Sequence, residues 1–207
     1  MPVLQKSALP LWGIWKIEES WEELLAQAKW PDDCLSFLNS SKSDSRKAEW
    51  LAVRMLLREL TGSETPIAYQ ASGAPYLPDA PYHIGISHTK GYAAVLLHPD
   101  HPAGIDIEYR SERIQKLKSR FLTEPELRLL GENPASTELL ICWSAKETAF
   151  KMTGQRMADW QKDLHILACD FSRNDGFLTV RETLTPPSAT YQIHYDIAPD
   201  FVLTRFP

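Results

Sequence analysis

Two acidic residues lie two positions apart in the segment GIDIEYR, residues 104–110. The alternation of Ile105 and Ile107 with Asp106 and Glu108 predicts a strand, and residues i and i+2 of a strand point to the same side. Two carboxylates on one face repel each other unless a cation or hydrogen-bond donors lie between them. The pair is therefore either the solvated edge of a strand or part of a site for Mg²⁺, which binds carboxylate, phosphate and water oxygens.

A second group of functional side chains lies in CWSAKETAFK, residues 142–151. On a helix, Trp143, Glu147 and Lys151 are spaced by four residues and share one face. Glu147 is a candidate third carboxylate or general base, and Lys151 a candidate phosphate ligand. The alternative is an intrahelical Glu147–Lys151 pair worth about 0.3–0.5 kcal/mol, with Trp143 in the core. Lys146 points about 100° away from Glu147 around the helix, so we expect it at the rim of the site or on the protein surface.

A third group is Ser87 and His88 in the segment GISHTKG, at the end of an expected strand. A hydroxyl and an imidazole at this position can donate hydrogen bonds to a phosphate. They do not form a nucleophilic pair, because adjacent residues of a strand point to opposite sides. The alternative is that both are ordinary turn residues.

The spacing of apolar residues predicts two long helices, residues 44–62 and 136–154, each ending at a glycine. The segment between Pro66 and Pro81 is expected to be largely loop because proline and glycine interrupt it repeatedly. Two strands within residues 82–99 are expected around a turn at Lys90 and Gly91. Further strands are expected at 104–110, 164–171, 176–184, 189–197 and 201–206, and helical segments at 20–30 and 111–132, the second broken at Thr123–Pro125.

Each half of the chain thus combines a long helix, a loop and a terminal strand-turn-strand unit. This pattern predicts an α+β fold of two similar subdomains related by pseudo-twofold symmetry, residues 1–103 and 104–207. Ligand sites often lie in the cleft between two such units.

The composition is that of a soluble globular protein, since 43% of the 207 residues are hydrophobic and 24% are charged. A net charge of −5 argues against a general nucleic-acid-binding protein, although it allows a local basic patch. The segment MPVLQKSALPLWGIW is a poor signal peptide, so we expect a cytoplasmic protein. Cys34, Cys142 and Cys169 show neither CxxC nor Cys/His spacing, so reduced thiols are expected rather than disulfides or a zinc site.

Taken together, these motifs resemble the 4′-phosphopantetheinyl transferases. The family signature G-[IV]-D-[IVL]-E is similar to GIDIE, and W-[ST]-x-K-E-x-x-x-K is similar to WSAKETAFK, which begins after 34 intervening residues. RFLTEPE, residues 120–126, is similar to the family's R-F-F-[ST]-x-x-E, and ISH precedes all three motifs. The chain length and the 103 residues before Gly104 resemble the larger, surfactin-synthetase-associated type, which is expected to be monomeric.

The resemblance implies the transferase fold and an activity. Such enzymes move the phosphopantetheine arm of coenzyme A onto a serine of an apo carrier protein and release adenosine 3′,5′-bisphosphate. It implies that Asp106, Glu108 and Glu147 bind Mg²⁺ and that Glu147 helps to deprotonate the serine, directly or through water. It also implies that Lys151 binds the pyrophosphate. Ser87 and His88 match the pair that binds coenzyme A.

The chain departs from the family pattern at Gly73-Ala74-Pro75, where relatives usually have Gly-Lys-Pro and the lysine grips coenzyme A. Lys42, Arg46 and Arg54 are candidate substitutes that would bind the 3′-phosphate. A smaller departure is Gly85, where many relatives carry asparagine.

Carrier proteins are acidic helical bundles, so docking onto this acidic chain requires a local basic surface. The segment Arg110–Phe121 is the candidate, with the alternative that it is a solvated helix face. Its basic and apolar residues are Arg110, Arg113, Lys116, Lys118, Arg120, Leu117 and Phe121.

Two other functions remain open from the sequence. The same carboxylates would suit a Mg²⁺-dependent hydrolase of a pyrophosphate-containing nucleotide. Because Ala74 removes a charge, a non-catalytic coenzyme A-binding relative is also possible. The motifs leave open whether a carrier would serve fatty-acid, polyketide or nonribosomal peptide synthesis.

Overall fold

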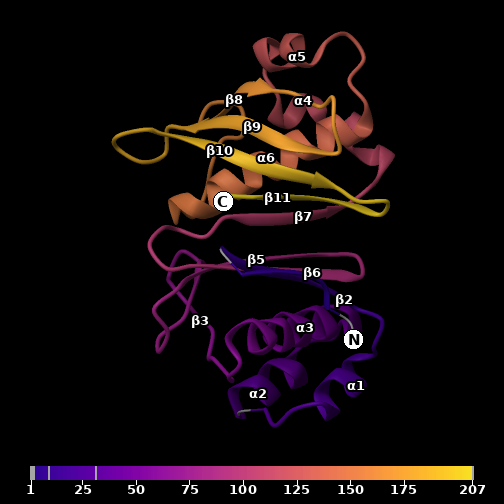
Figure 1. Ribbon diagram of the computed structural model, residues 1–207, viewed down its shortest axis with the longest axis vertical. Coiled ribbons are helices and arrows are strands. Elements are labelled where there is room, and N and C mark those ends of the chain that lie inside the picture. Colours follow the sequence, from indigo (N-terminus) through magenta and orange to yellow (C-terminus); the bar gives the residue numbers. More distant parts are fainter. Residues whose placement is uncertain (1–2, 9, 31, 207) are drawn as a thin grey trace.

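The computed structural model describes residues 3–8, 10–30 and 32–206. It contains two large antiparallel sheets, one from each half of the chain, each covered by one long helix (Figure 1), and a two-stranded sheet, β3-β4, in the first half. The mixed α+β class predicted from the sequence is therefore confirmed. None of the helices in the described ranges combines the length and apolar character that crossing a membrane requires.

The first sheet has the strand order β1-β2-β6-β5 and packs against helix α3. Its strands are β1 (Val3–Ala8), β2 (Leu11–Lys16), β5 (His83–Thr89) and β6 (Tyr92–His98). Helix α3 (Asp44–Thr61) begins where the Ser43 hydroxyl accepts a hydrogen bond from the Arg46 backbone N–H, and it ends at Gly62, whose φ is +74°. Leu51, Leu56 and Val95 are among the buried residues between helix and sheet. Helices α1 (Trp21–Ala26) and α2 (Asp32–Ser40) and the short strands β3 (Ala68–Tyr69) and β4 (Pro75–Tyr76) complete this half.

The second sheet has the strand order β7-β11-β10-β9-β8 and packs against helix α6 (Ser136–Thr153). Its strands are β7 (Ile105–Tyr109), β8 (Leu164–Cys169), β9 (Asp175–Glu182), β10 (Ala189–Ile197) and β11 (Phe201–Arg205). Ala145 and Ala149 on the helix pack in one core with Val180 and Val202 of the sheet. The short helices η1 (Glu112–Lys116), α4 (Lys118–Phe121) and α5 (Glu124–Leu130) follow β7.

The faces of the two sheets that carry no long helix pack against each other. Ile14 and Leu96 from the first sheet share a buried cluster with Ile105, Ile107 and Leu203 from the second. Strands β5 and β6 consequently lie next to β7 and β11 in the middle of the molecule (Figure 1). Ile105 and Ile107 have the core role that the alternation predicted.

The two halves share one element of topology. In each, a strand precedes the long helix and pairs antiparallel with the last strand of a later hairpin: β2 pairs with β6, and β7 pairs with β11. The sheets differ in their number of strands, four and five. The pseudo-twofold relation between the halves stays a prediction.

Several predicted boundaries shift in the structure. Helix α1 ends at Ala26 rather than near residue 30, and α2, β1 and β2 were not predicted. The segment after β7 forms three short helices instead of two, and Thr123 caps the last of them through a capping box with Glu126. Pro125 lies in the first turn of that helix, where its missing N–H costs no intrahelical hydrogen bond.

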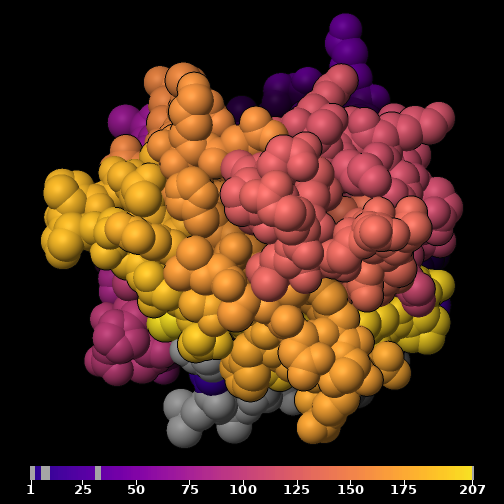
Figure 2. Space-filling view, turned by 90° about the horizontal axis from the view of Figure 1, so that it is seen from above, coloured from indigo at the N-terminus to yellow at the C-terminus, as the bar shows by residue number. Residues whose placement is uncertain are grey.

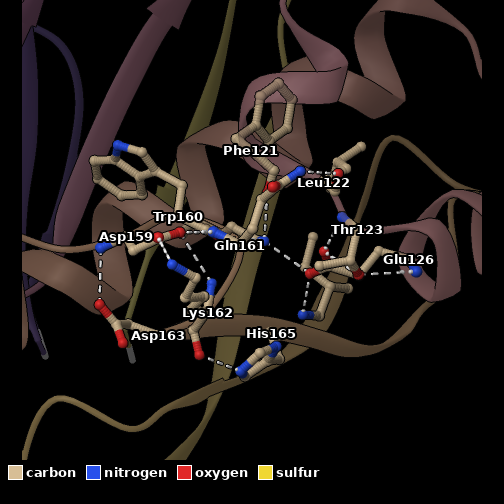
Figure 3. Close-up of polar contacts among 12 residues, drawn as sticks. Phe121, Leu122, Thr123, Glu126, Asp159, Trp160, Gln161, Lys162, Asp163 and His165 are labelled. Carbon is tan, nitrogen blue, oxygen red and sulfur yellow. Dashed lines mark hydrogen bonds and ion pairs between the residues drawn. The ribbon is translucent and has the colours of Figure 1, made fainter.

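The expected surface position of Lys146 is wrong, because this side chain is fully buried at 0% exposure. Its Nζ lies 2.8 Å from Oε1 of Glu126 and donates to the carbonyl oxygens of Phe121 (2.6 Å) and Trp160 (2.8 Å). Figure 3 shows Phe121, Glu126 and Trp160 with the polar contacts drawn around them. The prediction failed because it assumed one covered helix face, whereas α4, α5 and the segment around Trp160 cover a second.

We predict that Lys146→Met lowers the free energy of unfolding by about 3–5 kcal/mol, because it leaves the buried Glu126 carboxylate without its cation. Urea denaturation measures this change. Lys162→Met is the matched control, since Lys162 forms an exposed pair with Asp159 at 3.1 Å. This control should cost about 0–1 kcal/mol. Equal losses in the two variants would contradict a stabilising role for the buried pair.

Candidate functional site

A cleft of about 960 Å³ lies between the two halves and is lined by residues from both. Helix α3, strand β5 and residues 69–77 contribute from the first half, and β7, α6 and residues 154–156 from the second. All eight site residues predicted from the sequence line it: Arg46, Arg54, Ser87, His88, Asp106, Glu108, Glu147 and Lys151. Lys42, a further basic candidate, is not among the lining residues. The structure thus gathers motifs that are far apart in the sequence into one cavity.

Strand β7 can lie close to helix α6 because Gly104 precedes it. A Cβ atom at Gly104 would lie 2.8 Å from both the Met152 sulfur and the Thr148 carbonyl oxygen, too near for any larger residue. The Ser144 hydroxyl also donates to the Asp106 carbonyl oxygen at 3.4 Å. The glycine of the GIDIE motif therefore allows the acids of β7 to face the helix that carries Glu147 and Lys151.

Asp106 is the most contacted acid of the site. Its Oδ1 accepts hydrogen bonds from the Ser87 hydroxyl and from Lys151 Nζ, both at 2.8 Å. Lys151 also donates to the Ile105 carbonyl oxygen at 3.0 Å. The second carboxylate oxygen, Oδ2, is buried and has no hydrogen-bond partner among the described residues. Ser87, predicted as a phosphate ligand, thus contacts a carboxylate in this structure.

Glu108 and Glu147 lie in an environment that disfavours their charge. Glu108 Oε1 accepts a hydrogen bond from the Trp143 indole N–H at 2.9 Å. Burial, followed by repulsion from Asp106, raises the pKa of Glu108 to about 7. The same two causes raise the pKa of Glu147 to about 7. A cation placed among the three acids would offset this repulsion.

The donor chemistry of this cluster fits a hard divalent cation. Carboxylate oxygens are the protein ligands that Mg²⁺ uses, and the buried Asp106 Oδ2 has no other partner. Within the described ranges, however, no three acidic, histidine or cysteine side chains are arranged as a ready metal site. Lys151 instead forms an ion pair with Asp106. The residue types therefore fit the ion, whereas their present conformations are held by Lys151, Ser87 and Trp143.

Basic side chains line the part of the cleft that helix α3 contributes. The Arg54 guanidinium stacks on the Trp50 ring at 3.2 Å, and burial lowers the pKa of Arg54 below its ordinary value. His88 Nδ1 lies 3.1 Å from Glu49 Oε2. Arg46 lies near the start of the helix, where its backbone N–H donates to Ser43. Arg46 and Arg54 therefore give this part of the cleft positive charge outside the carboxylate cluster.

One basic residue of the cleft, Arg156, was missed by the sequence analysis. It follows Gly154, whose φ of +64° ends helix α6. The glycine marked the end of the helix, but no pattern in the sequence indicates that the chain then turns into the cleft.

The candidate docking segment is only partly a surface. Arg113, Lys116 and Arg120 are exposed, and Leu117 is 39% exposed. Phe121 is 1% exposed and belongs to the core, so its predicted place in the patch is wrong. Phe121, the one apolar residue of α4, points inward and packs edge to face against the Trp143 ring. Figure 2 shows the pink and salmon segment that contains η1, α4 and α5 as a broad part of one face of the molecule.

Comparison with known proteins supports one family. Residues 102–204 match the family model of the 4'-phosphopantetheinyl transferase superfamily. The match is a little under half of the chain and covers β7, α6 and the second sheet. None of the curated proteins matches the chain. The match supports a transferase of this superfamily, whose members use coenzyme A as substrate, and leaves the larger subgroup untested.

We predict that Glu147→Gln stabilises the metal-free protein at pH 8. The folded pKa of Glu147, about 7, exceeds the ordinary value of 4.5, so the folded state holds more protons between these values. Stability is therefore lost as the pH rises through this window, and a neutral glutamine avoids that loss. The variant should melt several degrees above the parent at pH 8 in the presence of EDTA.

At pH 4.5 the difference should largely vanish, because the folded carboxyl is then protonated. Glu64→Gln, in an exposed loop, controls for the substitution itself. A Glu147→Gln protein that melts below the parent at pH 8 would disprove the proposed repulsion.

Proposed function

We propose that the protein transfers the 4′-phosphopantetheine arm of coenzyme A to a serine of an apo carrier protein and releases adenosine 3′,5′-bisphosphate. We place it in the larger type of the family and infer that it acts as a monomer. The observation that carries the proposal is the common cleft, in which β5, β7, α3 and α6 present all eight predicted residues. The family match to residues 102–204 supports the same activity in general terms.

The basic side chains of the cleft support coenzyme A as its ligand. Arg46, Arg54 and His88 line it together with Arg156, and these groups suit the phosphates of the adenosine end. Ala74 lines the same cleft without contributing a charge. The neighbouring tyrosines, Tyr69 and Tyr76, offer apolar rings beside the basic groups.

Asp106, Glu108 and Glu147 are the residues that would hold Mg²⁺. When bound, the ion would neutralise the pyrophosphate oxygens and lower the repulsion among the acids. Lys151 Nζ, which now contacts Asp106 Oδ1, is a flexible cation that can also reach a phosphate oxygen. Ser87 holds the same oxygen of Asp106 and keeps the carboxylate directed into the cleft.

The transfer requires attack by the serine oxygen on the phosphorus that carries pantetheine. The bond from that phosphorus to the bridging oxygen breaks, and the bridging oxygen leaves with the 5′-phosphate of adenosine 3′,5′-bisphosphate. Lys151 stabilises the charge that develops on the leaving phosphate. Glu147, which lines the same cleft, is suited to accept the serine proton, directly or through water.

We predict that Asp106→Ala and Glu147→Ala each reduce transfer by about 10²- to 10⁴-fold, because they remove a cation ligand and the proton acceptor. The assay incubates the protein with coenzyme A, Mg²⁺ and several apo carriers and measures the added mass of the arm by mass spectrometry. Asp175→Ala, at an exposed position of β9, is the control and should retain parental activity. Near-parental rates in both site variants would contradict the roles proposed for Asp106 and Glu147.

The same assay separates the alternatives. A hydrolase would release phosphopantetheine or a nucleoside monophosphate without any carrier. A non-catalytic relative would bind coenzyme A and modify none of the carriers. Either result, with no arm added to any carrier, would count heavily against the proposed transfer.

We propose that an acidic carrier docks near Arg110–Phe121, mainly on the exposed basic residues of η1, which is separated from the end of β7 by two residues. Arg113→Glu and Lys116→Glu should raise the KM for the carrier about 10-fold, leave the KM for coenzyme A unchanged, and lose their effect at high salt. Lys29→Glu reverses an exposed charge in the first half and serves as control. Equal effects of the three variants would place docking elsewhere.

A further inference from the structure

Trp143 lies between the carboxylate cluster and the buried core of the second half. Its indole N–H donates to Glu108 Oε1 at 2.9 Å, which leaves the other oxygen of that carboxylate available to the cleft. Glutamate has more rotatable bonds than aspartate and loses more side-chain freedom when it is ordered. A donor that fixes Glu108 in advance therefore reduces the cost of using it as a ligand.

The indole ring itself is held by two aromatic neighbours. Its centroid lies 5.3 Å from that of Phe121, edge to face, and 4.9 Å from that of Trp160. The backbone carbonyl oxygens of both neighbours accept hydrogen bonds from the buried Lys146. Glu126 in turn binds Lys146 and accepts a hydrogen bond from the Ile166 backbone N–H at 2.8 Å.

The contacts form a continuous path from a buried ion pair to the site. Lys146 fixes the chain at Phe121 and Trp160, their rings pack on Trp143, and Trp143 fixes Glu108. Trp143 and Lys146 belong to the same helix, and neither is among the residues that line the cleft.

We propose that Trp143 is a positioning residue that holds Glu108 ready for a divalent cation, with the Lys146–Glu126 pair as its anchor. This inference rests on the proposed function, because it assumes that Glu108 is a metal ligand. It assigns Trp143 a role through the indole N–H, in addition to its role in packing.

The decisive variant replaces Trp143 alone by 3-benzothienylalanine, in which sulfur takes the place of the N–H while the two-ring shape is kept. Electron paramagnetic resonance measures the affinity for Mn²⁺ in the presence of coenzyme A. We expect a loss of about 10- to 100-fold, as found for ligands that lose an outer hydrogen bond. Trp143→Phe should show the same loss. Circular dichroism melting curves confirm that the variants fold.

Trp30→Phe is the matched control. It removes an indole N–H that donates to the Leu25 carbonyl oxygen in the first half, and Mn²⁺ affinity should not change.

A second readout is measured on the parent protein, and a variant serves only to assign the signal. We expect the seven tryptophans to give separate indole ¹⁵N–¹H resonances, and the resonance of Trp143 is the one that Trp143→Phe removes. Addition of Mg²⁺ with coenzyme A should shift the Trp143 resonance and leave that of Trp30 in place.

Parental Mn²⁺ affinity in the benzothienylalanine protein, with an unshifted Trp143 resonance, would overturn the inference and leave the proposed transferase intact. If the parent protein binds no Mn²⁺ in the presence of coenzyme A, that result would contradict both this inference and the proposed metal site.

Discussion

The site depends on the contacts of one oxygen atom, Oδ1 of Asp106, which Ser87 and Lys151 share. Oδ1 accepts hydrogen bonds from Ser87 on the first sheet and from Lys151 on helix α6, so one carboxylate joins both halves of the molecule. The contact requires β5 and β7 to lie side by side, which the packing of the two sheet faces ensures. It also requires α6 to approach β7 closely, which Gly104 allows. The cleft therefore has its acids at the junction of the halves.

Much of the site could be predicted from the sequence because its periodicities are local. A period of two residues predicted that Ile105 and Ile107 are buried, and a spacing of four predicted that Glu147 and Lys151 share a face. Neither rule predicts partners across the fold. The intrahelical pair of Glu147 with Lys151 was a reasonable alternative, but the lysine contacts Asp106 on the neighbouring strand. Contacts between segments depend on tertiary packing, which the spacing of residues along one segment does not reveal.

Local sequence patterns also predicted only part of the fold. The strands of the second half were predicted because turn residues separate them. Strand β2 was not, because Trp12 and Trp15 and the residues between them are all buried, so the usual alternation with polar residues is absent. Phe121 and Lys146 were both assigned to the surface, and the short helices after β7 bury both. The sequence of a helix alone does not reveal that the helix is covered on two sides, because this depends on how other segments pack against it.

Two lysines of helix α6, one fully buried and one partly exposed, show how this protein uses charge differently in its core and at the candidate site. Lys146 has three N–H donors and three acceptors, from Glu126, Phe121 and Trp160, so nothing is left for a ligand. Lys151 shares its partner Asp106 with Ser87, and the other oxygen of that carboxylate has no partner in the described part of the chain. A fully paired buried charge is suited to holding a fold, whereas an incompletely paired one retains capacity to bind. Lys146, which stabilises the fold, and Lys151, which belongs to the candidate site, thus lie only five positions apart on the same helix.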